Sequence, residues 1–173
     1  MSEVFVISDT HFGHRGILSF PQTKRFRPFD TIEEHDQELI KRWNNIVTPK
    51  DIVWHLGDFC FGKRYIPIAS ELNGSICLIL GNHDTYPIDF YLQYFDKVLG
   101  ITEYKGMLLS HIPVHPCQNA RYYMNIHGHL HTNHILRPDG SKDNHYFNAS
   151  CENTGLAPIP IDEALNFWAE NQG

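Results

Sequence analysis

The chain contains five short apolar runs that each end in a cluster of histidine, aspartate or asparagine. The runs cover residues 4–7, 52–56, 76–80, 107–110 and 122–126, and the clusters follow at 8–11, 57–58, 81–84, 111 and 127–131. Apolar runs of this length are typical of buried strands. Because ligands bind at the carboxyl ends of the strands in open α/β sheets, we expect the five clusters to converge on one crevice.

Helical segments separate the first three of these runs. Residues 31–47 keep a helical period of apolar positions, with Asp30 or Thr31 as the candidate cap and Pro49 beyond the end. Residues 63–72 form a second expected helix, although it contains Pro67. Residues 146–150 are expected to form a further strand, and residues 162–170 a last helix. This alternation predicts an α/β fold with parallel strands.

Length and charge narrow the classes of protein that this chain can represent. Its 173 residues suit one domain, 1–173, and its net charge of −6 disfavours extended binding to nucleic acid. No apolar run approaches the roughly 18–20 residues of a membrane span. The N-terminus has no basic leader and the four cysteines form no C-x-x-C pair. We therefore expect a cytoplasmic protein with reduced thiols and no membrane partner; its oligomeric state is left open.

Twelve histidines are an unusual number for this length and indicate metal chemistry. Seven oxygen and nitrogen donors follow the five apolar runs: Asp9, His11, Asp58, Asn82, His111, His129 and His131. The set exceeds what one tetrahedral ion uses and contains no thiolate. It therefore predicts a pair of divalent ions that share one carboxylate.

The ordered series Asp9-Thr-His11, Gly57-Asp58, Gly81-Asn82-His83-Asp84, His111 and Gly128-His129-Leu-His131 resembles the calcineurin-like metallophosphoesterases across residues 4–131. The resemblance implies a four-layer α/β/β/α sandwich of the metallophosphoesterase type. It also implies two ion sites, which are assigned to Asp9, His11 and His131 and to Asn82, His111 and His129, with Asp58 bridging both. His83 would be a proton donor or phosphate contact, oriented by Asp84. The metal is left open among Mn, Fe, Ni and Zn.

We therefore expect a metal-dependent hydrolase that cleaves a phosphate ester, with a diester favoured, by attack of a metal-bridging hydroxide. A phosphomonoesterase and a nuclease acting at nucleotide or nucleic-acid ends are the alternatives on the same site. A non-catalytic scaffold of this fold is a third alternative, which the presence of His83 beside a full ligand set disfavours. The substrate class is a small or nucleotide-like phosphate ester.

The segment 12–29 has no acidic residue and carries four cations among phenylalanines. Because it follows Asp9 and His11 directly, we expect it to form a loop over the crevice that holds an anionic substrate. Aromatic rings between arginines suit stacking on a base beside a phosphate. The candidate substrate-binding residues are His14, Arg15, Arg25 and Arg27, and Lys63 and Arg64 could add charge nearby. The alternative is a solvated loop whose phenylalanines turn into the core.

Overall fold

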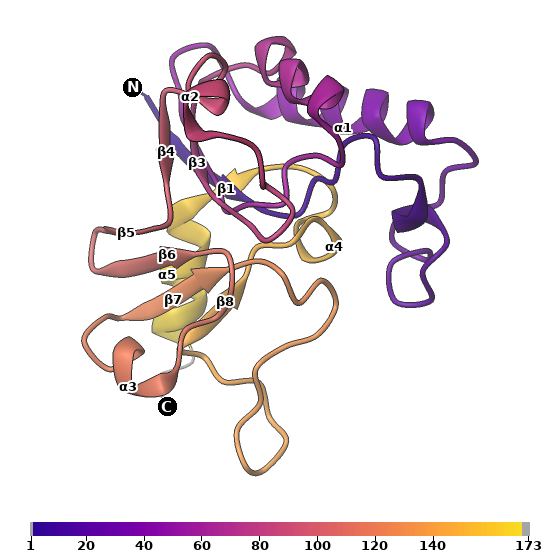
Figure 1. The fold of residues 1–173 in the computed structure, drawn as a ribbon. Coiled ribbons are helices and arrows are strands. Elements are labelled where there is room, and N and C mark those ends of the chain that lie inside the picture. Colours follow the sequence, from indigo (N-terminus) through magenta and orange to yellow (C-terminus); the bar gives the residue numbers. More distant parts are fainter. Residues whose placement is uncertain (1, 171–173) are drawn as a thin grey trace.

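Two sheets form the centre of the fold in the computed structural model, which describes residues 2–170 (Figure 1). The first sheet has the order β4-β3-β2-β1-β9, with β1 to β4 parallel and β9 antiparallel to β1. Its strands are β1 (Val4–Ile7), β2 (Ile52–His55), β3 (Ser75–Ile79), β4 (Lys97–Leu99) and β9 (Ile159–Pro160). The parallel pairing of β1, β2 and β3 confirms the sequence prediction.

The second sheet has the order β5-β6-β7-β8. Its strands are β5 (Ile101–Tyr104), β6 (Met107–Ser110), β7 (Met124–His127) and β8 (Tyr146–Asn148). Only β5 runs antiparallel to its neighbour, while β6, β7 and β8 are parallel. The carboxyl ends of β6 and β7 therefore share one edge, as those of β1, β2 and β3 do in the first sheet.

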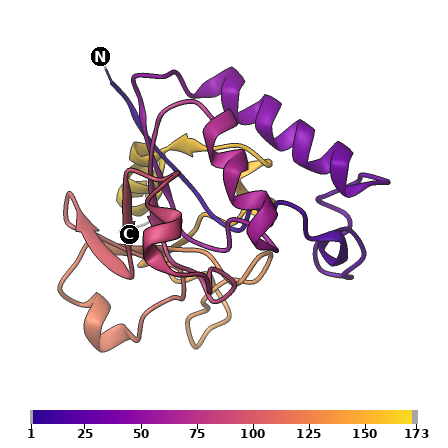
Figure 2. The ribbon, with the colours of Figure 1, turned by 45° about the horizontal axis from the view of Figure 1, so that its top comes forward.

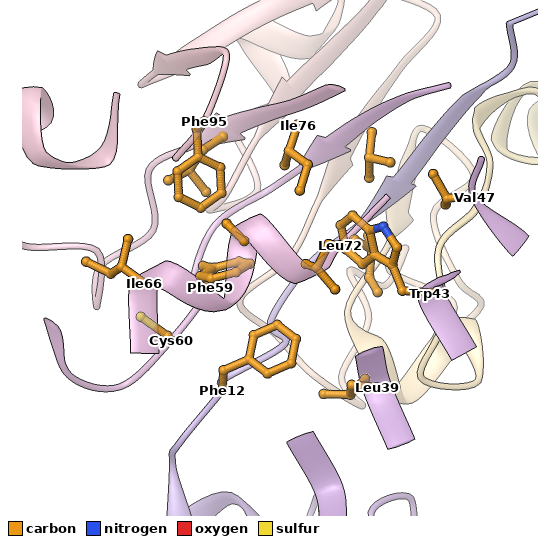
Figure 3. Close-up of a cluster of buried hydrophobic side chains, with 14 of the residues drawn as sticks. Phe12, Leu39, Trp43, Val47, Phe59, Cys60, Ile66, Leu72, Ile76 and Phe95 are labelled. Atoms are coloured by element: carbon orange, nitrogen blue, oxygen red, sulfur yellow. The ribbon is translucent and has the colours of Figure 1, made fainter. Parts of the chain in front are cut away.

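Helices cover one face of the first sheet. Figure 2 shows α1 (Ile32–Ile46) beside the 3-10 helix η2 (Lys63–Glu71) over this face. Thr31 and Glu34 form a capping box at the start of α1. The second segment forms a helix, as expected, in the tighter 3-10 geometry, and it accommodates Pro67, which cannot donate a backbone hydrogen bond. Figure 3 shows the buried cluster beneath, which includes Phe12, Leu39, Trp43, Phe59, Ile66, Leu72 and Ile76.

A second apolar layer lies between the two sheets. It joins one face of β1 to β3 to the inner face of β6 and β7, and α5 (Ile161–Glu170) adds to it. The buried side chains here are Val6, Trp54, Cys77, Ile79, Met107, Leu109, Met124, Ile126, Ile161 and Ala164. The alternation of side chains along each strand thus supplies both layers, which holds the two sheets together.

The remaining helices are short: η1 (Arg15–Leu18), α2 (Ile88–Tyr91), α3 (Pro116–Asn119) and α4 (Cys151–Thr154). Asn119 of α3 donates from Nδ2 to the carbonyl of His145, next to β8 in the second sheet. Two sheets with helices against them form the α/β sandwich that the sequence predicted. Within residues 2–170, no helix is long and apolar enough to cross a membrane.

Candidate metal centre

All seven candidate ligands follow the carboxyl ends of β1, β2, β3, β6 and β7. The structure brings six of them into two triads, and within each triad the ligand atoms lie within 4.8 Å of one another. The triads are Asp9, His11 and His131, and Asp58, His111 and His129. Asn82 joins the second triad, because its Oδ1 lies 3.0 Å from Nε2 of His111. Loops from both sheets therefore build one centre.

Asp58 belongs to the second triad and also faces the first. Its Oδ2 is 3.7 Å from Nε2 of His11 in one triad and 3.4 Å from Nε2 of His111 in the other. Its Oδ1 is occupied, since it accepts a hydrogen bond of 2.9 Å from the backbone N–H of His83. Oδ2 is thus the oxygen that faces both triads, which is the position of a bridging carboxylate.

Two buried polar atoms of the first triad have no hydrogen-bond partner among the described residues, Oδ1 of Asp9 and Nε2 of His11. Leaving such an atom unpaired costs about 1–3 kcal/mol. The other carboxylate oxygen of Asp9 is fully used, accepting from the backbone N–H of His129 and the hydroxyl of Ser150 at 2.9 and 2.8 Å. An oxygen and an imidazole nitrogen that point to one place without partners fit a divalent cation.

The backbone is strained at five of the seven candidate ligands. Their φ angles lie between 50° and 67°, in the left-handed region that residues other than glycine seldom adopt. These residues are Asp9, His11, Asp58, His129 and His131. Each such residue costs of the order of 1–3 kcal/mol and persists only where the surrounding structure imposes it. The strain is concentrated at the centre, as expected where side chains must be aimed at one point.

One glycine allows the loops to approach this closely. A Cβ on Gly81 would lie 2.3 Å from Oδ1 of Asp58 and 2.4 Å from its backbone nitrogen. No side chain larger than hydrogen fits there without moving the carboxylate. Gly81 therefore sets the position of Asp58 relative to the loop that carries Asn82.

The histidines of the centre differ in their proton affinity. Burial, together with the charge of Arg27, lowers the pKa of His11 well below its usual value, which keeps this ring neutral and able to bind a cation. Burial also lowers the pKa of His111 and His131, but Asp58 beside His111 and Glu152 beside His131 outweigh it, so both pKa values are raised. With raised pKa values, protons compete with a cation for these two rings.

A buried ion pair lies behind His131. The backbone of Glu152 is in α4, and its Oε2 lies 3.2 Å from Nδ1 of His131, which leaves Nε2 for the triad. Its Oε1 accepts a hydrogen bond of 2.7 Å from Nε of Arg27. The hydrogen bonds and charges of His131 and Arg27 outweigh burial and lower the pKa of Glu152 to about 2. Such a carboxylate fixes the tautomer and orientation of a ligating histidine.

The expectation that Arg27 binds the substrate is wrong. Its side chain is 0% exposed, and its guanidinium donates to the carbonyls of Asp9 and Thr10 at 2.6 and 3.0 Å. It therefore holds the first ligand loop from behind and does not face a substrate. The hydrogen bonds continue through His35 and Asp36, whose Oδ2 accepts from the backbone N–H of Gly13.

Sequence reasoning missed this support. The sequence predicts that the cations of residues 12–29 face an anionic substrate, whereas Arg27 has a counter-ion that is 125 positions distant. One signal was available for Ser150 and Glu152, since Ser150 ends the expected strand at 146–150 and Glu152 lies just beyond it, where the rule used for the ligands applies. Nothing local in the sequence distinguishes Arg27 from the exposed Arg25.

The expected pairing of His83 with Asp84 is wrong. Oδ2 of Asp84 accepts hydrogen bonds from the backbone N–H groups of Asp58 and Gly81, and Oδ1 accepts one from Phe59. Asp84 thus fixes the second ligand loop, and burial raises its pKa to about 6. His83 lies at the edge of the centre with its side chain 40% exposed and Nε2 4.0 Å from Oδ2 of Asp58.

The remaining substrate candidates lie in two places. His14 is beside the centre, with Nδ1 3.4 Å from Nδ1 of His11, and Arg15 borders the same surface hollow as His14. Arg25 borders a separate hollow with Leu18, Pro21 and Lys24, to which none of the seven candidate ligands contributes. The structure thus keeps His14 and Arg15 near the centre and gives Arg25 no place there.

The chain resembles known proteins, some over nearly all of its length and one over about half. A family model described as calcineurin-like phosphoesterase matches residues 3–172. An uncharacterized protein of Methanocaldococcus jannaschii is 37% identical over 172 residues, which cover 94% of this chain and 89% of that protein. The gene 66 protein of Mycobacterium phage L5 is 37% identical over 89 residues, 49% of this chain and 41% of that protein. The crystal structure of a protein of unknown function from Aquifex aeolicus has a TM-score of 0.69 and 25% identity, and the match covers 96% of this chain and 99% of that one.

Proposed function

The chain belongs to the calcineurin-like phosphoesterase family, and from that premise we propose that it hydrolyses phosphate esters, diesters in preference to monoesters, with two divalent ions held by the two triads. The observation that carries the proposal is the place of Asp58, whose Oδ2 faces His11 at 3.7 Å and His111 at 3.4 Å. Nitrogen and oxygen donors without thiolates suit Mn, Fe, Ni or Zn.

The charges of the centre favour a phosphate ester. Two divalent ions would contribute about +4, and the carboxylates of Asp9 and Asp58 about −2, so a net positive charge faces the substrate. When bound, two ions of this kind lower the pKa of a water molecule and stabilise the charge that develops on phosphorus. Asp9 and Asp58 hold this arrangement through one free oxygen each, since their second oxygens accept hydrogen bonds from the protein.

His83 is placed to act on the leaving group. Its ring lies at the edge of the centre, partly exposed, with Nε2 4.0 Å from Oδ2 of Asp58. From there the ring can donate a proton to the ester oxygen that leaves, or contact a phosphate oxygen. The hollow beside His14 supports the diester preference, because it offers room for a second ester substituent that a monoester lacks.

Turnover of bis(p-nitrophenyl) phosphate and p-nitrophenyl phosphate, measured with Mn²⁺ and after chelation, tests this function. We expect chelator-sensitive hydrolysis that is faster for the diester. His83→Ala should keep the bound metal and lose about 10²–10⁴-fold in kcat, the usual contribution of a positioned acid or base.

His145→Ala is the matched control, since this exposed histidine contacts Asp143 and lies away from the centre. Its kcat should equal that of the wild type. Binding of two ions without turnover of either ester would favour the alternative of a non-catalytic scaffold. An unchanged rate in His83→Ala would remove His83 from the mechanism.

A further inference from the structure

A surface hollow of about 640 Å³ opens beside the metal centre. We call it the Phe61 hollow; it is lined by residues 13–16 and 61–65. Both segments continue directly from ligand loops, the first from His11 and the second from Asp58. The position of the hollow next to the centre therefore follows from chain connectivity as well as from the contact between His14 and His11.

Backbone hydrogen bonds fix the two segments against each other. The N–H of Phe61 donates to the carbonyl of Phe12 at 2.8 Å, and the N–H of Phe12 donates to Phe59 at 3.0 Å. Gly13, with φ of 74°, allows close packing, because a Cβ there would overlap the ring of Tyr65. The hollow is therefore part of the packed fold.

Aromatic rings form one side of the hollow. His14 and Phe61 stack with ring centroids 4.4 Å apart and planes 15° from parallel. Phe61 is nevertheless 48% exposed, and its ring centroid lies 5.6 Å from that of His83. An apolar ring of this size held at the surface beside a catalytic candidate is suited to stacking on a planar group of the substrate.

Three cations line the same hollow and no acidic residue does. Lys63 lies with Nζ 4.2 Å from the ring centroid of Phe90, and Arg64 packs over Tyr65 and donates to its hydroxyl. Within residues 2–170, neither Lys63 nor Arg64 has a carboxylate within 4 Å. Arg15 has only a loose contact with Glu33, at 3.7 Å between two exposed side chains. This local positive charge stands out in a chain of net charge −6.

We propose that the Phe61 hollow binds the nucleoside portion and a further phosphate group of a small nucleotide diester whose scissile phosphate lies at the metal centre. The base stacks on Phe61, and the second phosphate lies beside Arg15, Lys63 and Arg64. A planar ring and a separate anion are the two features that this lining recognises, and a phosphorylated dinucleotide supplies both. This inference rests on the proposed function for the cleavage step, whereas binding in the hollow depends on the hollow alone.

Hydrolysis of three diesters tests the inference: adenylyl-adenosine with a 5′-terminal phosphate, the same dinucleotide without it, and bis(p-nitrophenyl) phosphate. The wild type should have the lowest KM for the phosphorylated dinucleotide. Phe61→Ala should raise KM for both dinucleotides by roughly 5- to 150-fold, which corresponds to the loss of one stacked base. The double variant Lys63→Ala/Arg64→Ala should remove the advantage of the terminal phosphate, and added salt should weaken binding to the wild type more than to this variant. Both variants should lose less kcat/KM on the aryl diester than on the phosphorylated dinucleotide, because the aryl diester carries no second phosphate and its single ring is smaller than an adenine base.

Matched controls carry the same changes elsewhere. Tyr123→Ala removes another exposed aromatic ring, and Lys24→Ala/Arg25→Ala removes two cations of the separate hollow. Neither should change KM for any of the three substrates. Equal losses on the aryl diester and the dinucleotides, or no loss in Phe61→Ala and Lys63→Ala/Arg64→Ala, would overturn the inference.

Binding calorimetry separates this inference from the proposed function. The phosphorylated dinucleotide is titrated into the chelator-treated protein, where no turnover can occur. Weak binding that Phe61→Ala and Lys63→Ala/Arg64→Ala abolish would support the hollow even if no ester were hydrolysed. Absence of binding to the wild type, with or without Mn²⁺, would refute it even if the aryl diester were cleaved. Tight binding of a long single-stranded oligonucleotide in preference to the dinucleotide would also contradict it.

Discussion

Replacing Glu152 by glutamine should weaken one ion site selectively. The glutamine can still accept from Nε of Arg27 through its amide oxygen, which places its NH₂ group 3.2 Å from Nδ1 of His131, where a carboxylate oxygen now lies. An NH₂ group donates, so Nδ1 must become the acceptor and the proton of the neutral ring must move to Nε2. Since Nδ1 of His131 faces Glu152, Nε2 is the nitrogen that remains for the triad with Asp9 and His11.

The size of the effect follows from the burial of this pair. Loss of the partner that orients a ligating histidine typically reduces metal affinity about 10- to 100-fold, or about 1.4–2.7 kcal/mol. The substitution also leaves the guanidinium of Arg27, at 0% exposure, without its counter-ion. Breaking a buried pair costs about 3–5 kcal/mol. Because glutamine keeps one hydrogen bond, we expect about 3 kcal/mol of destabilisation and a Tm lower by roughly 6–12 °C in a chain of this size.

Calorimetric titration with Mn²⁺ and thermal unfolding in chelator measure the two effects separately. One binding event should weaken 10- to 100-fold while the other changes less than about 3-fold. Glu38→Gln is the matched control, since Glu38 pairs with Arg42 and Lys41 on the exposed side of α1. This change should leave both binding events and the Tm as in the wild type, because an exposed ion pair contributes little to stability. Equal weakening of both events, or an unchanged titration with the Tm lowered, would refute the argument that Glu152 acts through His131.

Three further outcomes follow from the centre. Asp58→Asn should weaken both binding events, whereas His11→Ala should empty one, and elemental analysis giving at most one ion per wild-type chain at saturating metal would contradict the paired site. Since the pKa values of His111 and His131 are raised, protons compete with the cations, so metal affinity should rise with pH and metal binding should release protons. Calorimetric titrations in buffers of different ionisation enthalpy count the released protons. Release of no protons would disprove the assignment of these two histidines as ligands. Gly81→Ala should displace Asp58, weaken both ions and cost about 1–3 kcal/mol in unfolding free energy, which chemical denaturation measures.

The seven candidate ligands could be predicted from the sequence because the topology of the sheets determines where they lie. Each candidate follows an apolar run, and parallel strands bring their carboxyl ends to one edge. This rule needs no knowledge of side-chain contacts, and it located residues as distant as Asp9 and His131. Applied to the expected strand at 146–150, the same rule would also have pointed to its end at Ser150 and to Glu152 just beyond, which contact Asp9 and His131.

What the sequence could not give are contacts that depend on local backbone geometry. His83 and Asp84 are adjacent, yet the turn aims the carboxylate of Asp84 at the amides of Asp58 and Gly81 and leaves the ring of His83 at the surface. Similarly, the edge strands β4, β5 and β9 are two to four residues long. Strands as short as β5 were recognised where nearly every residue is apolar and buried, as in β1 and β6, whereas β4, β5 and β9 are partly exposed and present no continuous buried apolar run.

The left-handed ligand residues determine how the centre should respond to the loss of metal. Their conformation is imposed by hydrogen bonds that do not involve an ion: Asp84 accepts from the amides of Asp58 and Phe59, and Arg27 donates to the carbonyls of Asp9 and Thr10. The strain is thus balanced by the protein itself, and metal binding need not order the chain. We therefore expect the chelated protein to keep its circular dichroism spectrum and, at the amides of Asp58 and Phe59, its slow hydrogen exchange. If chelation made exchange at these amides as fast as in an exposed loop, the ions and not the protein would hold the loops in place.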